Sequence, residues 1–272
     1  ELLELLPEER CRELRADLHL DDEELARWDE VSRRMHVAFD GDGIICQFEG
    51  YEALEEFDWE GYRRKHGDIH RLDRLLEAEG DTANRYKASK QADVLMLFYL
   101  FSSEELKEIF DRLGYPFEYE TIPRNVDYYS RRTSHGSTLS RVVYSWVLSR
   151  GDRPRSWQLF KEALESDIAD IQGGTTPEGI HLGAMAGMVD LLQRGYTGIV
   201  TRGDVLWLNP CLPDELRFVS MVIRYRGHAL DLTVKQSSVT VHAHESNAAP
   251  IELGIVDKCH ILGAGETREF PL

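Results

Sequence analysis

Apolar residues recur at helical spacing from about residue 21 to residue 196. Leu25, Trp28, Val31 and Met35 lie three or four positions apart behind Asp21, a residue type that favours helix N-caps. This spacing predicts an amphipathic helix that begins at Asp21. The same periodicity, with start and stop residues, predicts further helices over residues 70–80, 137–149, 155–171 and 181–196.

Two other segments with a helical period carry additional signals. Ser102 and Glu105 form a capping box, and Gly114, followed by a proline, ends that helix. Residues 86–101 are amphipathic at their start and apolar on all sides at their end. That pattern is typical of a helix buried among other helices.

The pattern changes after residue 196. Short runs with period-two alternation and β-branched residues are separated by Gly, Ser, Asn and Pro, as in antiparallel strands joined by short turns. We predict a mainly α domain over residues 1–208 and a β domain over residues 209–272. The helical segments are too few to close a barrel, so we expect the helical domain to be incomplete.

Composition restricts the functional classes. The net charge is −17 and the pI is about 5.0, so neither nucleic acid nor anionic lipid is expected as a partner. No apolar run reaches the ~18 residues of a membrane span, and the first residues lack the basic start of a signal peptide. The four cysteines lie far apart without metal-ligand spacing, so we predict free thiols and a cytoplasmic protein. The sequence does not begin with Met, and we expect a portion of a longer protein.

A polar cluster stands where the helix over residues 137–149 is predicted to begin. Gly136 would let an anion approach the backbone, and Ser137 and Thr138 would offer hydroxyl groups. His135 would add a ring nitrogen. Because the first turn of a helix presents unpaired N–H groups and the positive end of its dipole, this start predicts an anion site. The alternative is that Ser134 or Ser137 is only an N-cap.

A second predicted helix start carries a histidine. His181 precedes a run of small residues, Gly183, Ala184, Ala186 and Gly187, which permits close approach of a neighbouring helix or a ligand. The alternatives are that His181 is satisfied within the protein or at its surface, and that the small residues serve helix packing alone.

Lys90 and Gln91, together with Lys87, are predicted to share one face of the helix over residues 86–101. A lysine beside a buried helix must reach solvent or find a polar partner. A ligand with many hydroxyl groups would be such a partner, and reaching solvent is the alternative.

His242 and His244 lie on one face of a predicted strand, where two imidazoles could hold a metal ion. A third ligand is not visible in the sequence. We therefore expect no metal site.

Three separated motifs, read together, resemble one family. They are KQADVL at residues 90–95, TSHGSTLS at residues 133–140 and TTPEGIHLGAMAG at residues 175–187. In this order they resemble the C-terminal half of glycoside hydrolase family 65, the family of inverting α-glucoside phosphorylases that act on trehalose, maltose or kojibiose. GIICQFEGY, RGDVLWLNPCLPDELR and IRYRGHALDLTV look like the same family, so the similarity covers nearly the whole chain.

The resemblance implies part of an (α/α)6 barrel followed by a small antiparallel β-sandwich. It implies that Lys90 and Gln91 bind hydroxyl groups of the glucose unit whose bond is broken. It implies a phosphate site lined by His135, Gly136, Ser137, Thr138 and His181. It also suggests a homodimer that uses inorganic phosphate as co-substrate, without a cofactor or a metal.

The implied reaction is phosphorolysis with inversion, which converts trehalose, our first choice of disaccharide, to β-glucose 1-phosphate and glucose. The family's general acid is a glutamate in a motif resembling DEYHENVDNNAYT, which we expect upstream of Glu1, so no catalytic acid is predicted in this chain. The missing N-terminal portion of the enzyme is then a partner, and the chain alone is expected to be inactive. The alternatives are a trehalase-type hydrolase of the same family and a non-catalytic sugar-binding fragment.

Overall fold

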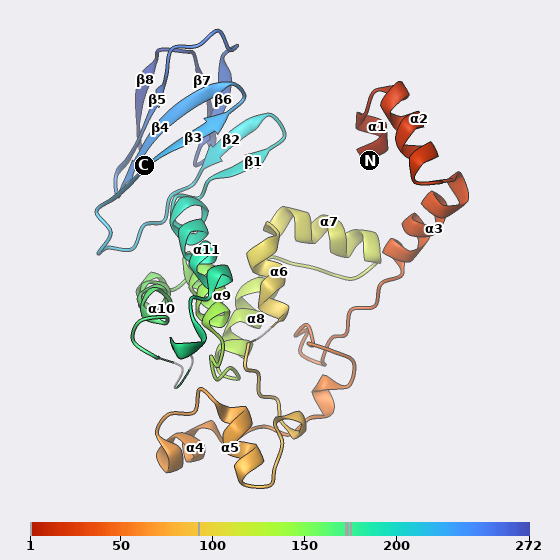
Figure 1. Cartoon of the computed structure of the whole chain (residues 1–272), viewed down its shortest axis with the longest axis vertical. Helices are drawn as coiled ribbons and strands as arrows, with labels where there is room; N and C mark the ends of the chain where they lie inside the picture. The colour runs from red at the N-terminus through yellow and green to blue at the C-terminus, as the bar shows by residue number, and fades with distance from the viewer. Residues whose placement is uncertain (1, 92, 172–173, 175) are drawn as a thin grey trace.

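A helical part and a β-sandwich follow one another along the chain (Figure 1). The computed structural model describes residues 2–91, 93–171, 174 and 176–272. The predicted fold class, mainly α with a C-terminal domain of largely antiparallel sheets, is confirmed. The helices are α1 (Leu2–Leu5), α2 (Glu8–Asp17), α3 (Asp22–Arg33), α4 (Trp59–His66), α5 (Leu72–Ala78), α6 (Val94–Leu100), α7 (Ser103–Leu113), α8 (Thr121–Ser130), α9 (Thr138–Leu148), α10 (Arg153–Glu165) and α11 (Leu182–Asp190). Short 3-10 turns are η1 (Tyr51–Ala53), η2 (Ala83–Arg85) and η3 (Thr176–Glu178), and the π-helical segment η4 (Leu191–Tyr196) continues α11.

Helix α3 begins where the sequence predicts, because Asp21 Oδ1 accepts a 2.7 Å hydrogen bond from Glu24 N. Its apolar stripe is not covered, and Trp28 is 53% exposed. No residue of α2 or α3, both of which are fully described, is buried. Arg112 of α7 donates a 2.8 Å hydrogen bond to Ser32 Oγ and so connects α3 to the rest of the helices. These first helices add little to the apolar core.

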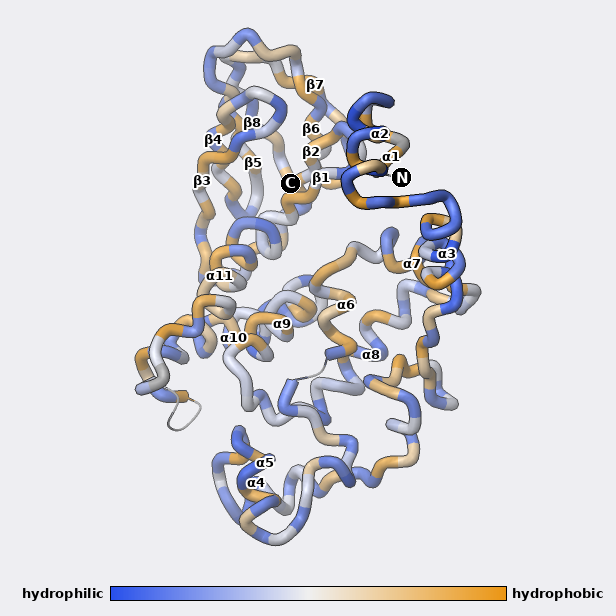
Figure 2. The backbone as a smooth tube through the Cα atoms, turned by 45° about the vertical axis from the view of Figure 1, so that its right-hand side comes forward, coloured by the Kyte–Doolittle hydropathy of each residue, from blue (hydrophilic) through white to orange (hydrophobic). Residues whose placement is uncertain are grey.

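The core of the helical part forms around α9, which packs against α6, α8, α10 and α11. Helix α6 is apolar apart from Tyr99, and most of it is orange in Figure 2. Helix α7 begins with the predicted capping box of Ser102 and Glu105 and ends at Gly114 in the left-handed region. Among the residues that the structure describes, no helix is long and apolar enough to cross a membrane.

The helix predicted over residues 86–101 begins only at Val94. Lys87, Lys90 and Gln91 therefore do not share a helical face, and that prediction is wrong. The predicted helix over residues 155–171 is also shorter, since α10 ends at Glu165.

A pairing with a distant segment explains why residues 87–91 are not helical. Ser89 N donates a hydrogen bond to Arg132 O, and Ser134 N donates one to Ser89 O, both at 2.8 Å. Ser89 and Thr133 thereby form a parallel bridge. Because these hydrogen bonds join residues more than forty positions apart, helical periodicity within the segment does not reveal them.

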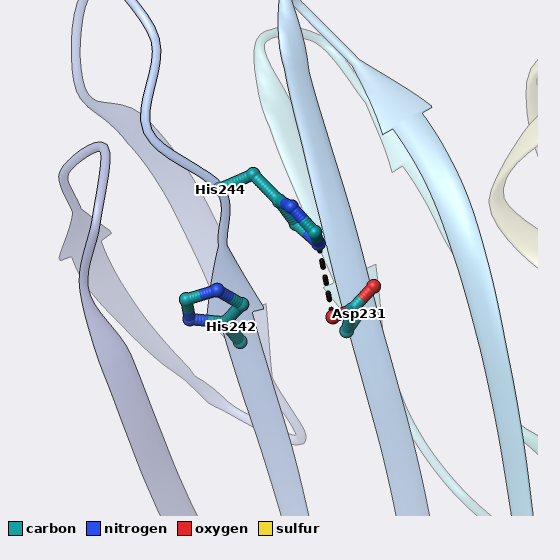
Figure 3. A group of neighbouring side chains, drawn as sticks. All are labelled: Asp231, His242 and His244. Carbon is teal, nitrogen blue, oxygen red and sulfur yellow. Dashed lines mark ion pairs between the residues drawn. The ribbon is translucent and has the colours of Figure 1, made fainter.

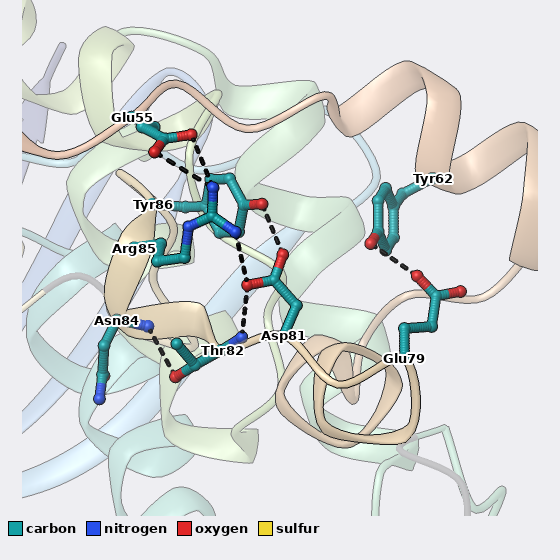
Figure 4. Close-up of polar contacts among 8 residues, drawn as sticks. All are labelled: Glu55, Tyr62, Glu79, Asp81, Thr82, Asn84, Arg85 and Tyr86. Atoms are coloured by element: carbon teal, nitrogen blue, oxygen red, sulfur yellow. Dashed lines mark hydrogen bonds and ion pairs between the residues drawn. The ribbon is translucent and has the colours of Figure 1, made fainter.

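Charged side chains hold the preceding segment (Figure 4). Arg85 pairs with Glu55 at 3.2 Å and with Asp81 at 3.1 Å. The Tyr86 hydroxyl donates a 2.6 Å hydrogen bond to Asp81 Oδ2, and this bond lowers the pKa of Asp81 below its usual value. These contacts fix the chain that leads to Lys90.

The β-sandwich consists of two sheets, with strand orders β1-β2-β6-β7 and β3-β4-β5-β8. The strands are β1 (Val200–Arg202), β2 (Val205–Leu208), β3 (Phe218–Tyr225), β4 (His228–Lys235), β5 (Ser238–Ala243), β6 (Ile251–Ile255), β7 (Lys258–Leu262) and β8 (Thr267–Pro271). Strands β2 and β6 are parallel, which the antiparallel prediction did not include. Strands β1 and β2 precede residue 209, so the sheets take in residues that the predicted boundary assigned to the helical domain.

Apolar residues of the two parts form one continuous cluster. The cluster joins Val142 of α9 and Met188 of α11 to Leu206 of β2 and Leu232 of β4. This shared core holds α11 between α9 and the sandwich, as Figure 1 shows.

Candidate functional site

Helices α9 and α11 pack side by side and run in the same direction. A Cβ atom at Gly187 would lie 2.7 Å from Val142 Cγ1, and a Cβ atom at Gly195, in η4, would lie 3.1 Å from Trp146 Cε3. Trp146 follows Val142 in α9, and Gly195 follows Gly187 in the helical segment of α11 and η4. The second contact is therefore further toward the C-terminus of both helices, and their N-termini lie at the same end of the pair. Each helix begins about 6 to 8 Å along its axis from the contact between Val142 and Gly187.

The small residues of α11 divide between two faces. Ala184 and Gly187 are buried, whereas Gly183 and Ala186 are exposed. A Cβ atom at Gly183 would meet nothing within 4 Å. The packing alternative for the small residues therefore holds for Gly187, which lets α9 approach closely.

The extended segment that contains Lys90 lies against the turn that opens α9. Gly136 N donates a 3.2 Å hydrogen bond to Lys90 O. A Cβ atom at Gly136 would lie 2.4 Å from His70 O and 2.9 Å from Lys90 Cγ, so this approach requires glycine. Lys90 is exposed and pairs with no carboxylate among the described residues. Gln91 Nε2 lies 3.5 Å from Asp93 Oδ1.

His135 adopts a left-handed backbone conformation, with φ at 54°. Its Nδ1 lies 3.0 Å from Ser140 Oγ, and its ring meets the ring of Tyr144 edge-on with centroids 4.6 Å apart. Burial, followed by the positive charge of Arg141, lowers the pKa of His135 to about 3. The imidazole is therefore neutral near pH 7.

A fully buried arginine supports this turn. Arg141 has an exposed fraction of 0%, and its Nε lies 3.2 Å from Glu162 Oε2. Arg141 Nη1 donates a 3.1 Å hydrogen bond to His135 O, and Nη2 lies 3.2 Å from His70 Nε2. Because a guanidinium only donates, His70 Nε2 accepts and the ring proton of His70 is on Nδ1. The sequence reasoning missed Arg141, although a charged residue within an apolar helical run was a signal for it.

Ser137 occupies the N-cap position of α9, but its side chain makes no capping hydrogen bond. Ser134 Oγ lies 3.4 Å from His70 O instead of contacting the first turn of α9. Thr138, the first residue of the helix, is buried. The alternative of a simple capping role therefore describes neither serine, and the Ser137 hydroxyl remains available for another partner.

His181 stands at the N-cap position of α11 and is held by Asp167. Asp167 Oδ1 lies 2.6 Å from His181 Nδ1, and Oδ2 accepts a 2.9 Å hydrogen bond from His181 N. Burial raises the pKa of Asp167, but the two hydrogen bonds from His181 outweigh it and lower the pKa below its usual value. Since the ionised carboxylate accepts, His181 carries a proton on Nδ1 and leaves Nε2 for another partner. The sequence held no signal for Asp167, which lies between α10 and the motif.

These residues place hydrogen-bond donors and positive charge at two neighbouring helix starts. The N-termini of α9 and α11 present N–H groups and positive dipole ends at one end of the pair. Lys90 adds an ammonium group beside Gly136. This arrangement suits a small anion. Ala92 and Thr175, which belong to two of the sequence motifs, lie outside the described residues.

Comparison with known proteins gives a consistent result. A sequence profile of the glycosyl hydrolase family 65 central catalytic domain matches residues 1–190, and one of the family 65 C-terminal domain matches residues 199–262. The chain is 52% identical, over 99% of its length, to an uncharacterized glycosyl hydrolase of Mycobacterium tuberculosis, of which it covers 20%. It is 34% identical, over 91% of its length, to trehalose 6-phosphate phosphorylase of Lactococcus lactis, of which it covers 32%. A kojibiose phosphorylase of Caldanaerobacter subterraneus is 32% identical over 82% of the chain, which covers 27% of that protein.

A solved structure, named as a kojibiose phosphorylase from the human microbiome, resembles the chain with a TM-score of 0.73 at 22% identity. The match covers 96% of this chain and 36% of that structure. This likeness establishes the fold. The chain spans about a fifth to a third of the length of the curated relatives it matches.

Proposed function

This chain belongs to glycosyl hydrolase family 65, and we propose that it carries the phosphate site and part of the sugar site of a disaccharide phosphorylase. The observation that carries the proposal is the shared end of α9 and α11, where Ser137 and His181 stand at neighbouring helix starts. Relatives named for the phosphorolysis of trehalose 6-phosphate and of kojibiose support this class of reaction. The proposed substrate is an α-linked glucose disaccharide, with trehalose the first to test.

In the proposed site, phosphate binds at the N-termini of α9 and α11. The Ser137 hydroxyl, which caps nothing, donates to one phosphate oxygen. Thr138 and the N–H groups of the first turn of α9 supply further donors. His181 Nε2 accepts from a protonated phosphate oxygen or, once protonated, donates to an ionised one, while Asp167 holds the ring through Nδ1. Gly136 lets His70 O and the Lys90 side chain approach the turn, and His135 stays neutral and orders the turn.

The proposed glucose contacts lie next to this anion site. Lys90 is free of carboxylate partners among the described residues, so its ammonium group can donate to sugar hydroxyl groups. The amide of Gln91 can both donate and accept. The hydrogen bond from Gly136 N to Lys90 O fixes the distance between the sugar contacts and the phosphate contacts.

The proposed chemistry needs one nucleophile and one proton donor. A phosphate oxygen forms a bond to the anomeric carbon from the face opposite the glycosidic oxygen, and the bond to that oxygen breaks. The departing oxygen takes a proton from a carboxylic acid, a role we assign to none of the described carboxylates. The products are β-glucose 1-phosphate and the second sugar.

Calorimetric titration of the 272-residue chain with inorganic phosphate tests this proposal. We expect a dissociation constant near 1 mM, with affinity reduced about tenfold or more by Ser137→Ala and by His181→Gln, because each removes a hydrogen bond to a charged group. Ser103→Ala is the matched control, since Ser103 begins α7 and its hydroxyl donates a 3.2 Å hydrogen bond to Glu104. The control is expected to bind phosphate as the parent does.

Two outcomes would contradict the proposal. One is the absence of phosphate binding by the parent chain, or equal loss of affinity in Ser103→Ala. The other is release of glucose from trehalose by the chain at the same rate with and without phosphate, which would favour a hydrolase.

A further inference from the structure

Two histidines and an aspartate meet on the outer face of the β3-β4-β5-β8 sheet (Figure 3). Asp231 on β4 pairs directly with His242 on β5. His244, just beyond the end of β5, places its ring near these two side chains. His244 N donates a 2.9 Å hydrogen bond to Ala229 O, which keeps its backbone aligned with β4. The ligand atoms of the three side chains lie within 4.8 Å of one another. The structure thus places a carboxylate beside the two histidines, and the sequence did not reveal this third group.

We propose that Asp231, His242 and His244 bind a first-row divalent cation, for which Zn²⁺ is the best match. Two imidazoles and one carboxylate, completed by water, are a common ligand set for four-coordinate zinc. Magnesium and calcium prefer sites built from oxygen atoms alone, so two nitrogen ligands disfavour both ions.

The spacing of one ligand pair is already close to what the ion requires. His244 Nε2 lies 2.9 Å from Asp231 Oδ2. Zinc bonds of ~2.0 to 2.1 Å in a tetrahedral arrangement separate adjacent ligand atoms by about 3.3 Å. The cation takes the place of the proton between these two groups, so only a small widening is needed there. The ligand atom of His242 already lies within 4.8 Å of the other two, so a small shift of its ring completes the site.

Thr267, which is not one of the proposed ligands, orients the ring of His242. Its Nδ1 lies 2.8 Å from Thr267 Oγ1, and Thr267 on β8 pairs directly with His242 in the sheet. Histidines that bind metals usually make such a hydrogen bond through their other ring nitrogen, which fixes the ring and the tautomer. Nε2 of His242 is left for the ion, and the rings of His242 and His244 lie 4.9 Å apart.

The site would join β4, β5 and the segment that follows β5. The net charge of −17 favours cations near the surface of the protein. Because the three ligands are brought together only by the folded sheet, the ion binds the folded state and raises its stability.

Calorimetric titration with Zn²⁺ tests the inference. The parent for this experiment carries Cys11→Ala and Cys259→Ala, because these free thiols are not buried and bind zinc themselves when ionised. We expect one ion per chain, a loss of affinity above about 100-fold for Asp231→Asn, His242→Ala or His244→Ala, and about tenfold for Thr267→Val. Glu269→Gln is the control, because Glu269 is an exposed carboxylate two residues from Thr267 on the same face.

A second measurement separates loss of binding from loss of folding. Zn²⁺ is expected to raise the midpoint of thermal unfolding in the parent and in Glu269→Gln, and to leave it unchanged in the three ligand variants, which circular dichroism should show to be folded. The inference fails if the parent binds no zinc, if the double variant His242→Ala/His244→Ala binds as tightly, or if Glu269→Gln weakens binding as much as Asp231→Asn.

Discussion

The same substitution at two positions of α11 should have opposite effects on stability. Gly183→Ala adds a methyl group in open space and relieves the entropic cost of a helical glycine, which should stabilise the protein by about 0.5 to 1 kcal/mol. Gly187→Ala relieves the same entropic cost, but it places the methyl group 2.7 Å from Val142 Cγ1 in a fully buried contact. Overpacking of this kind costs ~2 to 3 kcal/mol, so the net loss is about 1 to 2 kcal/mol.

A double variant isolates the cause of this loss. Val142→Ala alone should destabilise the protein by about 2 kcal/mol, because it leaves a cavity beside α11. In that background Gly187→Ala fills the space and no longer clashes, so it should become neutral or stabilising. The resulting interaction free energy between the two positions should reach about 2 kcal/mol.

Urea unfolding followed by circular dichroism at 25 °C measures the free energy of unfolding of all five proteins. If Gly187→Ala stabilises the chain as much as Gly183→Ala does, or if the two changes at 142 and 187 are additive, the helices do not meet at this contact. The common end of α9 and α11, on which the proposed phosphate site depends, would then lose its support.

Two further predictions concern the turn at His135. Glu162→Gln removes the carboxylate that pairs with the buried Arg141 and should lower the free energy of unfolding by about 3 kcal/mol. The exposed control Glu165→Gln should change it by less than about 0.5 kcal/mol in the same urea assay. Because the pKa of His135 is about 3 when folded and near 6.5 when unfolded, only the unfolded state binds this proton between those values. Stability should therefore fall as the pH drops from 6.5, by at most about 1.4 kcal/mol per pH unit. In His135→Asn the new asparagine tolerates a left-handed backbone. The free energy of unfolding of this variant, measured with urea, should depend less steeply on pH between pH 7 and pH 5. An unchanged pH dependence would contradict the low pKa of His135.

Relations between near neighbours made several parts of the fold predictable. Ser102 and Glu105 cap α7 across three residues, and Asp21 caps α3 across the same distance. The period-two alternation of β3, β4 and β5 identified strands because burial of one face constrains every second residue. The candidate residues at the starts of α9 and α11 could be selected from their sequence motifs, since glycine, hydroxyl residues and histidine at a helix start are visible without a fold.

Partners that are distant in sequence explain the errors and omissions. Residues 87–91 follow a helical period, yet hydrogen bonds between Ser89 and residues 132 and 134 hold them extended. Arg141 acquires its role from His70, which is 71 positions away, and His181 is held by Asp167, which precedes it by 14. Helix propensity amounts to less than about 1 kcal/mol per residue for most residue types, so backbone hydrogen bonds to another segment override it.

The sequence by itself determined the helix-then-strand order, the local caps and the family motifs, because each is encoded within a few residues or in a regular period. Tertiary structure decided that α9 and α11 begin at the same end, that β2 and β6 are parallel, and that Asp231 joins His242 and His244. These features depend on the register and direction in which separate elements meet. Packing of side chains such as Val142 against Gly187 sets that direction, and no local pattern specifies it.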